Sequence, residues 1–384
     1  MGTPPLHIVA NTSSSNEAFS RRTNELSRFI NTGNRNDHLT LIRTHPQSSK
    51  VTNDDRVTIH TIPLLDLLGT EIPTEVYKKS RSLEELRFAF GSLIDTMEKI
   101  VKDANVVLLD GTYFVPWCLL QAARRQCKPV VLCYAGLVSM EMGHLPSGMQ
   151  ETLRLMEKDF SDPNIHYIFP STLTKSTVER IFGHELPNSE VIYNGVGPEF
   201  LDYEQKSKKD IDVAFVGRTR PVKNPEFLVE LAGTFNRLGL PYLIHMVTNV
   251  ESNNRLISDL RRAGIVISEP LTNPELARFY GSTNVVISPS RFETYGNVPL
   301  EAVSVGTPAL VSPSMGICEV FDTLGIGNYV TTFDDPYAVA HRIDELIRKQ
   351  ERVPESVRNK IRAQFSWPKI IARYLAICSV RAVY

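Results

Sequence analysis

The chain has 384 residues, of which 42% are hydrophobic and 22% charged, and its formal net charge at pH 7 is -1. This length exceeds a single typical core, so we expect two domains. The near-zero charge lacks the excess of Lys and Arg that nucleic-acid binding needs, and no run of 18 apolar residues is long enough to span a membrane. These totals exclude nucleic acid as an expected partner and make membrane association unexpected.

The N-terminus and the cysteines both indicate a cytoplasmic protein. The opening MGTPPLHIVANTSSSNEAF lacks the charged start and long apolar segment of a signal peptide. The five cysteines are odd in number and show no CxxC spacing, as expected of unpaired thiols in a reducing compartment.

Residues 1–200 alternate between short apolar runs and amphipathic patterns. The runs predict buried strands at 6–11, 39–45, 57–63, 105–111, 129–136, 165–171 and 190–196. Helical periodicity covers 16–31, 82–104 and 148–160, and residues 45–55 have a loop composition. Strands alternating with helices predict a parallel sheet covered on both faces, which we assign as a first Rossmann-like domain.

A polar stretch at residues 197–212 separates this series from a second one, and we place the domain boundary at 200/201. Further strands are predicted at 213–218, 242–248, 265–270, 284–290 and 308–313. They predict a second doubly wound α/β domain over residues 201–366. The last of three closing amphipathic segments, at 367–384, follows no strand of its own and must dock elsewhere.

The stretch RFETYGNVPLEAVSVG places acidic and amide groups at the carboxyl end of a strand, where open α/β sheets bind ligands. We expect a helix after it, with Asn297 as N-cap and Pro299 tolerated in the first turn. Backbone N–H groups of Tyr295, Gly296 and Asn297 would donate to a ligand. The carboxylates of Glu293 and Glu301 would accept from hydroxyls, so the pattern suits a polyhydroxylated ligand.

The upstream stretch VAFVGRTRPVKNPEF has the same order of strand, loop and helix, but its loop carries basic residues in place of acidic ones. A buried strand leads to Gly217, Arg218 and Lys223, and a helix is expected to open near Asn224 and Pro225. Cations beside a helix N-terminus form a site for phosphate oxygens, and charge-assisted contacts contribute about 1.5–3 kcal/mol each.

Five ordered motifs, FVGRTRPVKN, RFETYGNVPLEAVSVGTPALVS, SMGICEV, VIYNGV and FSWPKIIARYL, together resemble the retaining GT-B glycosyltransferases of family 4, or glycosyltransferase group 1. The resemblance implies two facing Rossmann-like domains. The first would bind the acceptor and the second the nucleotide-sugar, and the final helix would cross back to the N-terminal domain.

The resemblance also assigns roles to individual residues. Arg218 and Lys223 would hold the diphosphate and Glu293 the sugar hydroxyls, and these three would be the catalytic residues. Glu301 would bind the ribose, and the amides of Tyr295, Gly296 and Asn297 would hold the sugar. The turn containing Gly316 and Glu319 would help to shape the cleft.

The N-terminal half departs from the family pattern in two places. Ser14 and Ser15 stand where the family has glycines, and their amides would still reach the phosphate. Ala135 stands where the family commonly has a histidine; His144 is either its substitute at the acceptor or an ordinary loop histidine. At the end of the strand 105–111, Asp110 either orients the acceptor or caps the next helix.

The function that follows is a retaining, metal-independent transfer of a sugar from a nucleotide-sugar to a small hydrophilic acceptor, such as a natural-product or aminocyclitol core. UDP is preferred as the commonest nucleotide of the family, and no metal or other cofactor is expected because no D-x-D motif is present. A pseudo-glycosyltransferase, a nucleotide-sugar epimerase or a non-catalytic nucleotide-sugar-binding protein remain alternatives. The sequence does not indicate an oligomeric state.

Overall fold

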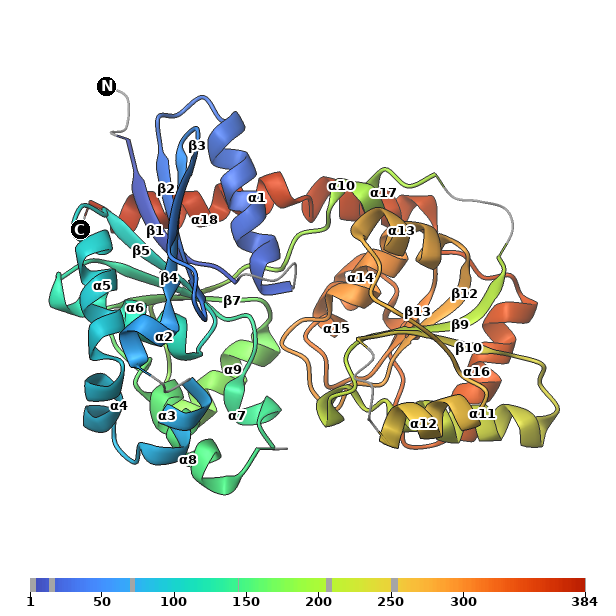
Figure 1. The fold of residues 1–384 in the computed structure, drawn as a ribbon. Helices are drawn as coiled ribbons and strands as arrows, with labels where there is room; N and C mark the ends of the chain where they lie inside the picture. Colours follow the sequence, from blue (N-terminus) through green and yellow to red (C-terminus); the bar gives the residue numbers. More distant parts are fainter. Residues whose placement is uncertain are drawn as a thin grey trace. The chain divides into compact units, whose positions relative to one another are not determined.

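The computed structural model describes residues 5–13, 18–69, 73–143, 145–204, 209–249 and 255–383 (Figure 1). The chain divides into two compact units. Unit 1 consists of residues 1–192 and 368–384, and unit 2 of residues 193–367. The sequence pattern placed these divisions at residues 200 and 366.

Unit 1 is built on a sheet in the order β3-β4-β2-β1-β5-β6-β7-β8, counting the described strands. All neighbours pair in parallel except β3 and β4. The central strands β5, β6 and β7 are buried along their whole length, as expected of strands covered on both faces. The strands are β1 His7–Asn11, β2 His38–His45, β3 Lys50–Asp54, β4 Val57–Pro63, β5 Val106–Asp110, β6 Val130–Cys133, β7 Ile165–Phe169 and β8 Ser189–Val191.

Strand β3 corrects the loop expected at residues 45–55. It pairs with β4 at the edge of the sheet, with Lys50 opposite Thr61 and Asp54 opposite Val57. Its side chains are mostly exposed, so no apolar alternation marks it in the sequence. The strand is held by its backbone hydrogen bonds to β4, and a pattern of buried side chains cannot predict such a strand.

Helices cover both faces of this sheet. Helix α5 packs against α6, and α1 contacts α18 through Arg22 and Tyr374. The helix expected at 82–104 is divided at Phe90, which ends α4 and precedes α5. The helices are α1 Ala18–Thr32, α2 Leu64–Leu68, α3 Pro73–Lys79, α4 Leu83–Ala89, α5 Gly91–Val101, α6 Phe114–Arg125, α7 Val138–Glu141, α8 Ser147–Lys158, α9 Thr172–Phe182 and α18 Trp367–Arg381.

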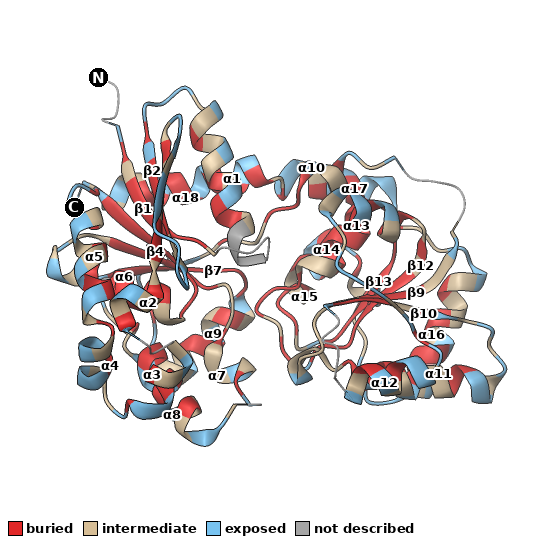
Figure 2. Cartoon of the chain, viewed as in Figure 1, coloured by how far each residue is buried: buried red, intermediate tan, exposed pale blue. Residues whose placement is uncertain are grey.

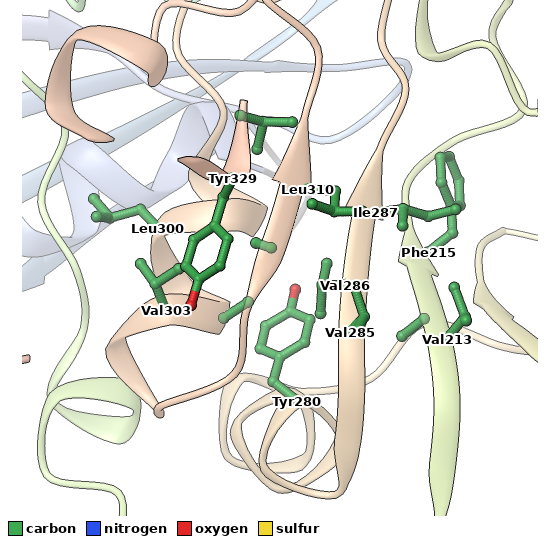
Figure 3. Close-up of a cluster of buried hydrophobic side chains, with 14 of the residues drawn as sticks. Val213, Phe215, Tyr280, Val285, Val286, Ile287, Leu300, Val303, Leu310 and Tyr329 are labelled. Atoms are coloured by element: carbon green, nitrogen blue, oxygen red, sulfur yellow. The ribbon is translucent and has the colours of Figure 1, made fainter. Parts of the chain in front are cut away.

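Unit 2 has an entirely parallel sheet in the order β11-β10-β9-β12-β13, counting the described strands. Valine, isoleucine and leucine side chains of β9, β12 and β13 meet Tyr280 and Leu300 in its core (Figure 3). The strands are β9 Ile211–Val216, β10 Ile244–Val247, β11 Val266–Ser268, β12 Thr283–Ser288 and β13 Ala309–Val311.

Helices α11, α12 and α16 lie on one face of this sheet, and α13, α14 and α17 on the other (Figure 1). Buried residues line the sheet and the inner sides of these helices, whereas their outer sides are exposed (Figure 2). The helices are α10 Pro198–Leu201, α11 Glu226–Leu238, α12 Arg255–Arg262, α13 Asn273–Gly281, α14 Asn297–Ser304, α15 Cys318–Leu324, α16 Pro336–Arg348 and α17 Glu355–Gln364, with 3-10 turns at Pro221–Lys223 and Gly327–Tyr329.

Each sheet has a point at which the strand order reverses. In unit 1, β1 lies between β2 and β5, and in unit 2, β9 lies between β10 and β12. Open α/β sheets bind ligands at the carboxyl ends of the strands at such a point. Asp110 ends β5, and the loops carrying Arg218, Lys223 and Glu293 follow β9 and β12, so the predicted residues lie beside these two positions.

The C-terminal helix α18 belongs to unit 1 from residue 368 onward. The guanidinium of Arg381 forms a hydrogen bond with His166 Nδ1 of β7 at 2.8 Å. The guanidinium of Arg22 makes a cation–π contact with Tyr374 of α18, 5.5 Å from the ring centroid. The predicted pair of Rossmann-like domains with a returning final helix is confirmed. Among the described helices, none is long and apolar enough to cross a membrane. The five cysteines are unpaired, and Cys127 is exposed.

Candidate functional site

The loop after β9 positions the predicted phosphate-binding cations. Gly217 comes directly after the strand and packs closely against the ring of Phe215. A β-carbon on Gly217 would lie only 3.1 Å from that ring. Lys223 is the last residue of the 3-10 turn Pro221–Lys223, and Asn224 after it adopts a left-handed conformation with φ of 54°. Helix α11 begins at Glu226 with Pro225 as its N-cap, in agreement with the start expected near Asn224 and Pro225. The left-handed conformation of Asn224, which asparagine tolerates, ends the preceding turn.

The side chains of Lys223 and Glu293 meet between the loops after β9 and β12. The Lys223 Nζ forms a salt bridge with Glu293 Oε1, and the same oxygen accepts from Ser290 Oγ at 3.1 Å. Both groups are partly accessible, with 30% of the Lys223 side chain and 18% of the Glu293 side chain exposed. A cation and a carboxylate therefore face solvent together at the strand-order reversal.

Backbone hydrogen bonds fix Glu293 in place. Its N–H donates to the Ser314 carbonyl at 3.1 Å, and its own carbonyl accepts from Gly316 N–H at 3.1 Å. The neighbouring Arg291 N–H donates to the Val222 carbonyl at 2.8 Å, which ties this loop to the turn that carries Lys223. The predicted residues Gly316 and Glu293 are thus held side by side.

Gly296, not Asn297, is the N-cap of α14, which corrects the expected cap. The φ of Gly296 is +112°, a backbone conformation that residues with a β-carbon rarely adopt. A β-carbon on Gly296 would also lie 2.8 Å from Met315 Cε. Asn297 is instead the first helical residue, and its Oδ1 accepts from Asn194 Nδ2 at 3.1 Å. No side chain caps this helix, so its first turn presents backbone donors and a positive dipole end.

The other predicted donor-site residues are more deeply placed. Glu301 is only 3% exposed and accepts from the Tyr280 hydroxyl at 3.4 Å. Tyr295 is 2% exposed, and its ring stacks on Tyr193 with centroids 6.2 Å apart. Glu319 accepts from the Tyr193 hydroxyl at 3.4 Å.

Three residues of this site were not singled out in the sequence. Ser290 bonds Glu293, Asn194 bonds Asn297, and Tyr193 contacts both Tyr295 and Glu319. Tyr193 and Asn194 lie in the motif VIYNGV, which was recognised without an assigned role. Ser290 ends the run NVVISPS, and its polar side chain at the end of a buried strand was the available signal.

In unit 1, Asp110 forms a buried ion pair with Arg22 at 2.5 Å. Asn11 at the end of β1 exchanges two hydrogen bonds with the Asp110 backbone, at 2.8 and 2.9 Å. Burial alone would lower the pKa of Arg22, but the carboxylate of Asp110 raises it well above its usual range. Asp110 does not cap helix α6, whose N-cap is Tyr113, so that alternative is wrong. An acceptor role for Asp110 stays a prediction.

Other predicted positions of unit 1 give less information. Ser14, Ser15 and His144 lie outside the described residues. The segment after β6 carries Gly136 close to the Glu141 carboxylate, since a β-carbon there would lie 2.8 Å from Glu141 Oε1. Within the described ranges, no group of three or more His, Cys, Asp and Glu side chains is placed to hold a metal ion. Metal independence stays a prediction.

Comparison with known proteins gives a family likeness for the part of the chain that carries this site. Residues 198–364 match the family described as glycosyl transferases group 1. An uncharacterized glycosyltransferase of Methanocaldococcus jannaschii is 25% identical over 252 residues, or 59% of this chain and 63% of that protein. A D-inositol 3-phosphate glycosyltransferase of Pseudarthrobacter chlorophenolicus is 34% identical over 111 residues, or 27% of this chain and 26% of that protein. The matches thus span less than two thirds of these relatives.

Solved structures extend the likeness to both units. Sucrose-phosphate synthase from Thermosynechococcus elongatus has a TM-score of 0.75 at 16% identity, over 97% of this chain and 98% of that one. The α,α-trehalose 6-phosphate synthase of Burkholderia multivorans has a TM-score of 0.67 at 11% identity, over 99% and 97%. The expected GT-B fold is confirmed, and the resemblance to group 1 is confirmed for residues 198–364.

Proposed function

We propose that this protein is a glycosyltransferase that moves a sugar from a nucleoside diphosphate sugar to a small hydrophilic acceptor. The match of residues 198–364 to glycosyl transferases group 1 is the premise. The observation that carries the proposal is the pairing of Lys223 with Glu293 between the loops after β9 and β12. A cation suited to a diphosphate and a carboxylate suited to sugar hydroxyls occupy one place.

In the proposed reaction, the bond between the anomeric carbon and the diphosphate oxygen breaks, and its electron pair leaves with the phosphate. Arg218 and Lys223 stabilise that charge, together with the backbone donors at the first turn of α14. The acceptor hydroxyl attacks from the face that the diphosphate leaves, and its proton passes to the departing phosphate oxygen. The anomeric configuration is thereby retained without a protein nucleophile or a metal ion.

The salt bridge adds a step to donor binding. Lys223 already has the Glu293 carboxylate as its partner, so a donor phosphate must compete for the ammonium group. Binding of the diphosphate then releases Glu293 to accept from the sugar hydroxyls. The Ser290 hydroxyl, 3.1 Å from Glu293 Oε1, keeps the carboxylate oriented during this exchange.

For the donor we propose a UDP-sugar, and for the acceptor a polyol or natural-product core such as an aminocyclitol. Relatives named D-inositol 3-phosphate glycosyltransferase support an acceptor of the cyclitol class. The acceptor part of the proposal concerns unit 1, which lies entirely outside the matched residues 198–364.

Calorimetric titration of UDP, GDP and ADP in the presence of EDTA tests the donor site. We expect one nucleotide to bind without metal, and an Arg218→Ala change to weaken it roughly tenfold or more. Arg237→Ala is the matched control, because Arg237 bonds Tyr337 and lies outside both loops. Absence of binding by all three nucleotides, or binding unaffected by Arg218→Ala, would contradict the proposal.

Product analysis separates the alternatives. With the donor identified, nuclear magnetic resonance of the product should show a new glycosidic bond with the donor's anomeric configuration. An inverted configuration would exclude the retaining mechanism. Nucleotide release with a non-glycosidic linkage would favour a pseudo-glycosyltransferase, and an epimerised donor would favour an epimerase. Binding with neither transfer nor donor hydrolysis would indicate a non-catalytic binding protein.

A further inference from the structure

A cavity of about 430 Å³ opens in unit 2 beside the loop that carries Glu293, and residues 289–291 of this loop line it. It lies at the carboxyl ends of β12 and β13, against the N-terminal ends of α11 and α16, which cover the same face of the sheet (Figure 1). Neither Lys223, Glu293 nor the residues 295–297 are among its lining residues. The volume falls within the range of about 300–1,000 Å³ typical of small-molecule pockets. The cavity therefore adjoins the loops after β9 and β12, through Asn224, Ser290 and Arg291, but does not include the residues proposed to hold the donor.

Two aromatic rings contribute apolar surface to this cavity. Phe227 of α11 and Phe333 pack edge to face, with ring centroids 5.2 Å apart and planes at 87°. Phe227 is 3% and Phe333 9% exposed, so the surrounding core buries most of each ring and only an edge reaches the cavity. These aromatic edges give the cavity a small apolar wall for the aliphatic C–H groups of a sugar or cyclitol ring.

Apart from Pro289 and Pro313, the other lining side chains are polar, and together they carry excess negative charge. Hydroxyls come from serine and threonine side chains on three loops, and carboxylates come from Glu226, Glu230 and Asp334. Arg291 is the one cation among the described lining residues, and it donates to Asn224 Oδ1 at 3.2 Å. Three acidic groups against one basic group give a formal charge of -2. This charge disfavours a phosphorylated ligand and favours a protonated amine.

One side chain connects the cavity with the proposed donor site. Ser290 lines the cavity and is only 2% exposed, and its hydroxyl donates to Glu293 Oε1 at 3.1 Å. Its neighbour Arg291, also in the lining, bonds the turn of Lys223 through Val222 at 2.8 Å. A molecule in the cavity thus lies one hydrogen bond away from the Lys223–Glu293 pair.

We propose that this cavity binds a small hydroxyl-rich amine, of the amino sugar or aminocyclitol class, as a ligand additional to the nucleotide-sugar. The edges of Phe227 and Phe333 contact the ring, the serine and threonine hydroxyls bond its hydroxyls, and the carboxylates bind the ammonium group. The occupant changes nucleotide binding through the Ser290–Glu293 hydrogen bond. This last step rests on the proposed function, whereas binding in the cavity does not.

Titration of the full chain with D-glucosamine, D-glucose and D-glucose 6-phosphate at pH 7 tests the cavity. We expect glucosamine to bind most tightly and glucose 6-phosphate least. Glu230→Gln and Asp334→Asn should each weaken glucosamine binding about two- to fivefold, because each removes one exposed charge from the lining. Asp259→Asn is the control, since Asp259 is a partly exposed acid of α12 outside the lining. No glucosamine binding, or binding insensitive to both lining variants, would overturn the proposal.

The connection to the donor site has its own measurement. Saturating glucosamine should change the affinity for UDP several-fold in the natural protein, and this change should disappear in Ser290→Ala. An equal effect of glucosamine in both proteins overturns the route through Ser290. If no nucleotide binds at all, the proposed function fails, but the glucosamine titrations with Glu230→Gln and Asp334→Asn still decide whether the cavity is a ligand site.

Discussion

Gly195 lies directly against the indole ring of Trp367, since a β-carbon on Gly195 would stand 2.6 Å from Cδ2 of that ring. The two residues belong to the segments by which the chain enters and leaves unit 2, at residues 193 and 367. Beside them, the Val196 N–H donates to the Phe365 carbonyl at 2.7 Å. The entering and leaving segments of unit 2 are thus joined by a backbone bond and by the close packing of the indole on a glycine.

Gly195→Ala should destabilise unit 2, because the added methyl group would overlap a ring that is itself 97% buried. Overpacking of this kind costs about 1–3 kcal/mol. A loss of 1 kcal/mol lowers the melting temperature by about 2–4 °C in a domain of 150–250 residues. Thermal melting followed by circular dichroism measures the effect. Gly91→Ala is the control, because a β-carbon on Gly91 has no heavy atom within 4 Å. Equal melting temperatures for the two variants would contradict this packing argument.

Glu293→Gln should separate nucleotide binding from catalysis. The change removes the charge that holds Lys223, so UDP should bind several-fold more tightly through a stronger attraction to the freed ammonium group. Transfer should nevertheless slow by about 100-fold, since one polar contact to the transition state is weakened. Calorimetry and steady-state kinetics measure the two effects, with Glu345→Gln on α16 as the control. Weaker UDP binding in Glu293→Gln would show that Glu293 does not compete with the phosphate for Lys223.

Gly296→Ala should disturb the start of α14. A φ of +112° is strained for any residue with a β-carbon, and such strain costs about 1–3 kcal/mol. The nearest atom to the new methyl group is Met315 Cε, at the end of a flexible side chain that can move away. We therefore expect the double variant Gly296→Ala/Met315→Ala to remain impaired in nucleotide binding. Full recovery of binding in the double variant would assign the effect to the Met315 contact and not to the backbone.

The strands of both sheets were predictable because they are buried on both faces and therefore form continuous apolar runs, as in VVLLD of β5 and TNVVIS of β12. Edge strand β3 was not, since its exposed side chains leave no such run. The positions of Lys223 and Glu293 after two strands were also readable from the sequence. Their salt bridge was not predictable, because it depends on β9 and β12 being neighbours in the sheet. In the chain, residues 217–282 lie between the end of β9 and the start of β12.

Asp110 illustrates a different limit of sequence analysis. Its place at the end of a buried strand indicated a functional acid, but its partner Arg22 comes from helix α1 and is 88 positions away. The two residues come together because β1, which precedes α1, lies beside β5 in the sheet. No local sequence pattern contains this strand order. The same holds for Ser290, whose role depends on where the Glu293 side chain turns.

Asp110→Asn should lower stability more than activity. It would leave the guanidinium of Arg22, with only 7% of its side chain exposed, without its carboxylate partner. Removing one member of a buried ion pair costs about 3–5 kcal/mol. Denaturant unfolding measures this loss, and Asp95→Asn, which changes an exposed ion pair with Arg125, is the control. A variant of normal stability with a strongly reduced kcat/KM for the acceptor would instead establish Asp110 as an acceptor-binding residue.

His166 should make the attachment of α18 sensitive to pH. Burial lowers the pKa of His166, and the nearby charge of Arg381 lowers it further, with Glu190 opposing. The folded protein therefore disfavours the protonated ring, whereas the unfolded chain protonates it near pH 6.5. The stabilising contribution is present above pH 6.5 and is lost as the pH falls through the lowered pKa of the folded state.

Melting temperatures measured between pH 7.5 and pH 5 should accordingly fall toward acid, and His166→Gln should flatten part of that fall. Burial also lowers the pKa of His60 and His245, so part of the dependence should remain in the variant. His341→Gln, at an exposed position of α16, serves as the control and should leave the profile unchanged. Because Arg381 bonds His166 at 2.8 Å, protonation also places two cations side by side at the end of α18. An unaltered pH profile in His166→Gln would show that this contact does not couple α18 to pH.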